Sequence, residues 1–178
     1  LTRGKKIIYG SGDIGFSLTT TIIGVYFLFF MIEVVGLRPA LAGIPIAVGK
    51  FWDFINDPLF GYLSDRTRTR WGRRRPFLLF GALPLAVTFT MLWYRPALTT
   101  PAALVAYYSL AYLFFEASAT LLYMPYFALT PELTSDYDER TSLTSYRMFF
   151  SILGSLLAFP VPLMIIGKFS PENLSRVL

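Results

Sequence analysis

The sequence of 178 residues contains no cysteine and no histidine. Without cysteine, these residues form no disulfide and offer no thiolate to a metal or a substrate. Without histidine, they lack the side chain that most often relays protons near neutral pH. A disulfide framework, a Cys/His metal centre and histidine-based catalysis are therefore excluded within this sequence. No nucleophile–base pair or metal cluster stands out among the other residues, so we predict neither an enzyme nor a cofactor.

Charged residues are also scarce, at 15% of the sequence against about 25% in soluble domains. Hydrophobic residues make up 54% and aromatic residues 17%, and the mean hydropathy is +0.54. This composition predicts an all-α polytopic membrane protein surrounded by the lipid bilayer. The net charge is +5. Because the basic residues lie mostly in short gaps between apolar segments, and not on a soluble face, we predict no nucleic-acid partner.

Five apolar segments are long enough to cross a bilayer, which takes about 20 residues in a helix. We predict transmembrane helices over residues 7–35, 40–64, 76–94, 102–129 and 143–167, and the start of a sixth near Pro171. The first segment is too long for a signal peptide and lacks a cleavage site, so we expect no cleavable signal. Since the sequence opens with Leu1 and not with Met, we expect a few residues to precede it.

Basic residues are concentrated on one side of these predicted helices. They precede the first helix, fill the gap between the second and third (residues 66–75), and flank the gap between the fourth and fifth. Short loops rich in Lys and Arg stay in the cytoplasm, so the N-terminus is predicted to be cytoplasmic. The arginines of residues 66–75 either serve this topology alone or have a further role.

The second predicted helix carries Lys50, Asp53 and Asp57 on one face, with Asn56 beside them. A charge in hydrocarbon costs at least ~2.5 kcal/mol, so such residues usually line a pathway or hold an ion. Carboxylates with an amide oxygen suit a small hard cation such as Na⁺. Alternatively, one carboxylate carries a proton, or Lys50 forms a neutral ion pair with one aspartate that braces the bundle.

Two further polar stripes lie in the first and fourth predicted helices. Asp13 lies inside a glycine-rich stretch over residues 10–15, whose glycines are typical of close helix packing, and Ser17 is on the same stripe. We expect Asp13 to pair with Lys50 or with a substrate. In the fourth helix, Glu116 shares a face with Thr120 and Tyr123. Glu116 is either protonated or paired within the bundle, or it is a functional carboxylate.

Several motifs together resemble one family of transporters. The motif over residues 70–77 (RWGRRRPF) resembles the loop signature of the major facilitator superfamily. Taken together and in their order along the sequence, the motifs named below resemble those of the glycoside–pentoside–hexuronide:cation symporters. They cover nearly the whole sequence. The motifs are residues 9–13 (YGSGD), 53–58 (DFINDP), 61–66 (GYLSDR), 70–77, 124–131 (MPYFALTP), 138–140 (DER) and 146–147 (YR).

The resemblance implies twelve helices in two halves that give alternating access to a central site. Residues 1–178 match the N-terminal transmembrane half, and the C-terminal half lies outside this sequence. In the family, helix-two oxygens and a helix-four threonine hold the coupling cation. The matching residues, predicted here to bind a cation, are Asp53, Asn56, Asp57 and Thr120.

The predicted substrate site departs from the family pattern. Ser17 and Tyr123 stand where melibiose permeases have carboxylates that grip sugar hydroxyls, and Asp13 and Glu116 lie one or two turns away as substitutes. The predicted substrate site therefore consists of Asp13, Ser17, Lys50, Glu116 and Tyr123. The resemblance also implies a cytoplasmic gate formed by Asp65, Arg66, Arg70, Gly72, Arg73 and Arg74.

The resulting prediction is a secondary active transporter in a bacterial inner membrane, which couples Na⁺ or H⁺ to symport of a sugar or glycoside-like solute. One alternative is a transporter-derived structural or assembly subunit of a larger membrane complex. A second is a lysolipid carrier, because animal carriers with similar motifs move lysophospholipids. A third is that two such halves dimerise into a transporter.

Overall fold

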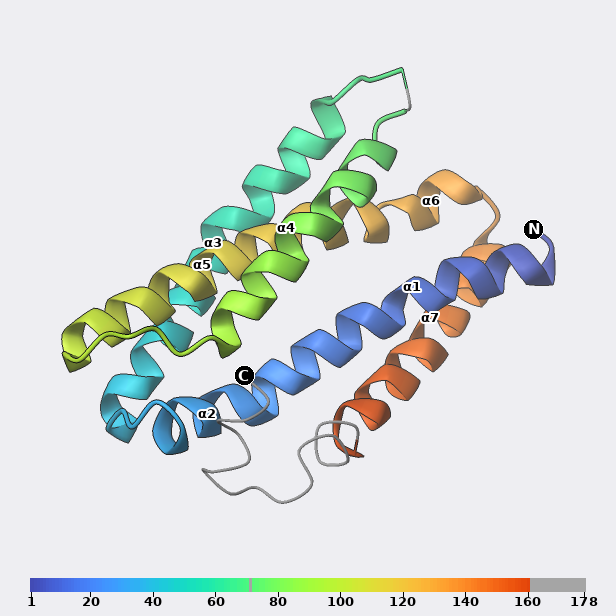
Figure 1. The fold of residues 1–178 in the computed structure, drawn as a ribbon. Coiled ribbons are helices and arrows are strands. Elements are labelled where there is room, and N and C mark those ends of the chain that lie inside the picture. Colours follow the sequence, from blue (N-terminus) through green and yellow to red (C-terminus); the bar gives the residue numbers. More distant parts are fainter. Residues whose placement is uncertain (71, 161–178) are drawn as a thin grey trace. The chain divides into compact units, whose positions relative to one another are not determined.

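A computed structural model describes residues 1–70 and 72–160. Within that part of the chain the secondary structure is helical, with no strand (Figure 1). The all-α fold predicted from the sequence is therefore confirmed. The elements are α1 (Arg3–Ile22), η1 (Ile23–Phe27), α2 (Leu28–Glu33), α3 (Pro39–Arg66), α4 (Arg75–Trp93), α5 (Pro101–Phe127), α6 (Leu129–Leu133) and α7 (Tyr137–Ala158).

Five long helical stretches correspond to the five predicted spans. Residues 3–33 form one stretch, in which the π-helical turn η1 joins α1 to α2. By length and composition, Arg3–Glu33, Arg75–Trp93 and Pro101–Leu133 are apolar enough to cross a membrane. At 28 residues α3 is also long enough, but it carries the charged cluster of the second predicted helix.

The fifth helix begins earlier than predicted. It starts at Tyr137 and not at residue 143, because Asp136 caps it: the Asp136 carboxylate accepts a hydrogen bond of 2.8 Å from the Glu139 backbone N–H. The apolar run that guided the prediction starts only after this polar first turn. The predicted end of this helix at residue 167 and the predicted sixth helix near Pro171 lie outside the described residues.

The chain divides into two compact units. Among the described residues, the first unit contains Leu1–Phe29 and Leu129–Pro160, and α1 packs along α7 in it (Figure 1). Glycines permit this close approach: a Cβ on Gly154 would lie 2.7 Å from the Ile14 carbonyl oxygen, and one on Gly10 would lie 3.0 Å from the Tyr146 backbone. The packing interpretation is thus confirmed for Gly10, whereas Gly15 has open space around it.

The second unit contains Phe30–Ala128, in which α5 packs against both α3 and α4. Aromatic side chains form its core. The Phe30 ring meets Trp93 edge-on at 5.3 Å and Tyr108 at 6.3 Å between ring centroids. Gly49 of α3 lies so close to α5 that a Cβ there would be 2.0 Å from the Tyr112 ring. This close approach allows polar side chains of α3 to reach those of α5.

Candidate cation and substrate site

Two predicted cation ligands meet between α3 and α5. The Thr120 hydroxyl donates a hydrogen bond of 3.1 Å to the Asp57 carboxylate. Thr120 is buried, and Asp57 is half-buried. A carboxylate and a hydroxyl oxygen from two different helices are thus within reach of one small ion.

Asn56 brings a third oxygen to the same helix pair. Its side chain is fully buried, and its amide N–H donates to the Glu116 backbone carbonyl at 3.3 Å. The amide oxygen accepts no hydrogen bond from any residue in the described part of the chain. A buried acceptor without a partner costs about 1–3 kcal/mol. An oxygen in this state gains free energy from any cation or water that reaches it.

Asp53 is engaged differently from Asp57. The Lys50 ammonium donates to the Asp53 carboxylate at 3.2 Å and to the Glu116 carboxylate of α5 at 3.0 Å. Both contacts are ion pairs, and Glu116 is the more buried of the two acids, with 13% of its side chain exposed against 27% for Asp53. The ion pair between Lys50 and an aspartate, expected from the sequence as an alternative, is therefore present. Its extension to Glu116 across the helix pair was not predicted.

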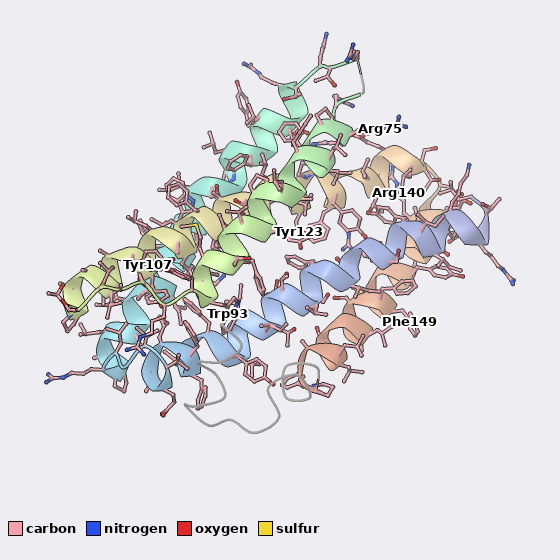
Figure 2. All side chains as sticks on the ribbon, viewed as in Figure 1. Arg75, Trp93, Tyr107, Tyr123, Arg140 and Phe149 are labelled. Atoms are coloured by element: carbon pink, nitrogen blue, oxygen red, sulfur yellow. The ribbon has the colours of Figure 1, made fainter. Side chains whose placement is uncertain are left out.

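The predicted substrate residues fall into the two units. Lys50, Glu116 and Tyr123 belong to the second unit, and Tyr123 is buried with its ring stacked on Phe127 at 6.3 Å (Figure 2). Asp13 and Ser17 belong to the first unit and are both buried. The predicted substrate residues therefore form two sets, one in each unit.

In the first unit, the partner of Asp13 is Arg147 of α7. The Arg147 Nε atom lies 3.9 Å from Asp13 Oδ2, while Asp13 Oδ1 is buried with no hydrogen-bond partner among the described residues. The Ser17 hydroxyl donates to the Asp13 backbone carbonyl at 2.9 Å and contacts the Ser151 hydroxyl at 2.5 Å. Sequence reasoning named Lys50 or a substrate as the partner of Asp13. Arg147 was not named, although it is a charge within the predicted helix 143–167 and in that sense was visible in the sequence.

The predicted gate residues lie at the junction of α3 and α4. Arg74 is buried, and its guanidinium donates to the Asp65 carboxylate at 2.6 Å and to the Ser64 hydroxyl at 2.6 Å. Ser64 was not predicted. The Arg66 guanidinium lies 4.5 Å above the Tyr62 ring, a cation–π contact.

Gly72 supplies the turn between these two helices. Its φ angle is +96°, a region that only glycine adopts without strain. Arg70 and Arg73 lie in the same connection and are exposed. Of the six predicted gate residues, Asp65 and Arg74 are thus joined to each other directly.

Known proteins that are similar in sequence to this chain are named as transporters. The profile of the family described as MFS/sugar transport protein matches residues 8–176. The uncharacterized symporter sll1374 of Synechocystis is 46% identical over 165 residues, covering 90% of this chain and 30% of that protein. The inner membrane symporter YicJ of Escherichia coli is 31% identical over 173 residues, which are 97% of this chain and 37% of that protein.

An animal protein is similar as well. The sodium-dependent lysophosphatidylcholine symporter 1 of Gallus gallus is 31% identical over 165 residues, covering 92% of this chain and 31% of the chicken protein. The chain therefore spans about a third of the length of these curated relatives.

Proposed function

The chain belongs to the MFS/sugar transport protein family and is an integral membrane protein; on that premise we propose that it forms the N-terminal half of a cation-coupled symporter. The observation that carries the proposal is the arrangement of Asp57, Thr120 and Asn56. The Asp57–Thr120 hydrogen bond joins α3 to α5, and the unpaired buried amide oxygen of the neighbouring Asn56 belongs to the same helix pair. Oxygen ligands of this kind suit Na⁺.

The proposed ligands of the transported cation are Asp57, Asn56 and Thr120. Asp57 supplies the negative charge, Asn56 supplies a neutral oxygen, and the Thr120 hydroxyl rotates its proton away to offer a lone pair. Asp53 can join only when Lys50 releases it. Lys50 then keeps its ion pair with Glu116, so the ammonium itself is not left unpaired in the membrane.

The charges of the cluster explain why a cation is drawn to it. Asp53, Asp57 and Glu116 carry three negative charges when ionised, and Lys50 neutralises one of them. An excess negative charge in a membrane helix pair is costly, and a bound cation lowers it. H⁺ on Asp57 would do the same, so the coupling ion is Na⁺ or H⁺.

The proposed solute is a sugar or a glycoside-like molecule. The family description names sugar transport. Within the first unit, the buried Asp13 and Ser17 offer polar groups to hydroxyls, and within the second unit the half-buried Glu116 and the buried Tyr123 do so. The bacterial relatives support placement in the inner membrane, and the arginine-rich connection between α3 and α4 supports a cytoplasmic N-terminus.

A lysolipid is the second candidate solute. The similarity to a sodium-dependent lysophosphatidylcholine symporter favours it, as does the replacement of two family carboxylates by Ser17 and Tyr123. Accumulation of radiolabelled lysophosphatidylcholine would identify the lysolipid as a substrate, whereas competition with a glycoside also arises from an inhibitor that is not transported. A panel of both solutes in one assay therefore separates the two candidates.

The test is uptake into proteoliposomes that contain the purified protein, driven by either a Na⁺ or a pH gradient. Asp57→Asn is expected to abolish uptake against a concentration gradient while exchange down a gradient persists. The matched control is Asp138→Asn, which removes an exposed carboxylate in the first turn of α7. Undiminished accumulation by Asp57→Asn would contradict the coupling role.

A further inference from the structure

The arginine-rich connection between α3 and α4 divides into two parts with different surroundings. Arg74 is buried and committed to Asp65 and Ser64. Arg75 is exposed at the first residue of α4 (Figure 2). Together with Arg70 it lines an open pocket of about 540 Å³. Arg75 takes no part in the contacts of Arg74 with Asp65 and Ser64.

The other wall of this pocket is apolar. Leu78 and Leu79, one turn further into α4, complete its lining. Leu79 is 65% exposed, and its side chain continues an exposed stripe through Leu83, at 73%, and Val87, at 53%. Residues four apart lie above one another on a helix, so Arg75, Leu79, Leu83 and Val87 form one row from the end of the span inward.

From this row we infer a binding site for an anionic phospholipid, with its phosphate at Arg70 and Arg75 and one acyl chain along Leu79, Leu83 and Val87. The order of the residues matches the order of groups in a lipid: charge at the membrane surface, then hydrocarbon. Guanidinium groups bind phosphate through paired N–H donors. The site lies wholly in the second unit and does not depend on the proposed transport activity.

Charge complementarity favours an anionic lipid over a zwitterionic one. Between residues 65 and 75 the sequence has six arginines and a single acid, Asp65, which is paired with buried Arg74. By sequence, residues 65–75 therefore carry a net charge of +5, from six arginines and one aspartate. A zwitterionic headgroup would bring its own cation close to these arginines, whereas phosphatidylglycerol would not.

The experiment is native mass spectrometry of the purified full-length protein, titrated with phosphatidylglycerol, phosphatidylcholine or inorganic phosphate. Each arginine near an anionic surface contributes about fivefold in affinity. Wild type should retain phosphatidylglycerol about fivefold or more tightly than phosphatidylcholine. Arg75→Gln should lower that preference about fivefold, and Leu79→Gln should weaken the binding of both lipids.

Arg68→Gln is the matched control, because it removes an exposed charge from the same connection without altering the pocket lining. It should keep the preference for phosphatidylglycerol. Equal binding of the two lipids by wild type would overturn the inference. So would an equal loss in Arg68→Gln and Arg75→Gln, which would indicate a diffuse charge effect. Phosphate binding as tight as that of phosphatidylglycerol would overturn the assignment to a lipid.

Discussion

The two units treat their membrane-embedded charges in different ways. In the α1–α7 pair, Asp13 faces Arg147, so one acid meets one base, and two pairs of hydroxyl groups also meet across the contact. In the α3–α5 pair, Lys50 is shared by Asp53 and Glu116, while Asp57 binds only a threonine among the contacts described. A balanced pair is suited to holding a neutral polar solute. An excess of acid is suited to attracting a cation.

The largest expected effect comes from widening the α3–α5 contact. Gly49→Ala places a Cβ 2.0 Å from the Tyr112 ring, so α3 and α5 must separate or the buried ring must move. We expect a lower thermal unfolding midpoint and loss of cation-driven uptake. Gly43→Ala on the same helix is the control, because nothing lies within 4 Å of a Cβ there.

A rescue experiment sharpens the comparison between the units. Tyr112→Leu added to Gly49→Ala should restore part of the midpoint, since the obstacle is a side chain. Gly154→Ala in the α1–α7 pair meets the Ile14 backbone oxygen at 2.7 Å, so no single side-chain change should rescue it. Equal midpoints for Gly49→Ala and Gly43→Ala would show that the α3–α5 contact is looser than described.

A smaller effect is expected from Lys50. Lys50→Gln removes the ammonium that occupies Asp53, so the cation should compete more easily for that carboxylate. Because Lys50 is 61% exposed, the change in apparent cation affinity should be about fivefold, as for a partly solvated ion pair. Lys50→Arg, which keeps the charge, should leave the affinity near that of wild type. The concentration of Na⁺ or H⁺ that gives half-maximal uptake measures this shift, and a weaker affinity in Lys50→Gln would contradict it.

The smallest effect on coupling is expected in the α1–α7 pair. Arg147→Gln leaves Asp13 without its ion-pair partner, so the KM for the solute should rise several-fold. The apparent affinity for the cation should stay unchanged, because the cation residues belong to the other unit. Kinetics of uptake at varied solute and cation concentrations separate the two constants. A change confined to the cation constant would reverse the assignment of the two regions.

The helices could be predicted from the sequence because each is a long apolar run bounded by polar or proline-containing segments. The pairing of Lys50 with Asp53 could also be predicted, since the residues lie three apart on one helix. The contacts of Lys50 with Glu116 and of Asp13 with Arg147 could not be predicted, because they depend on the rotation and depth of one helix against another. That register is set by Gly49, Gly154 and their neighbours, whose packing no local pattern reveals.

The α3–α5 site is tested most directly by Na⁺ binding to the purified protein without solute, measured by isothermal titration calorimetry. The account predicts one saturable Na⁺ site in wild type, weakened in Thr120→Val and absent in Asp57→Asn, with Asp138→Asn unchanged. If H⁺ is the coupling ion, titration with acid should show that wild type takes up one proton at this site. Asp57→Asn should take up none there. If Asp57→Asn binds Na⁺ or H⁺ as wild type does, this result would contradict the claim that α3 and α5 hold the coupling cation.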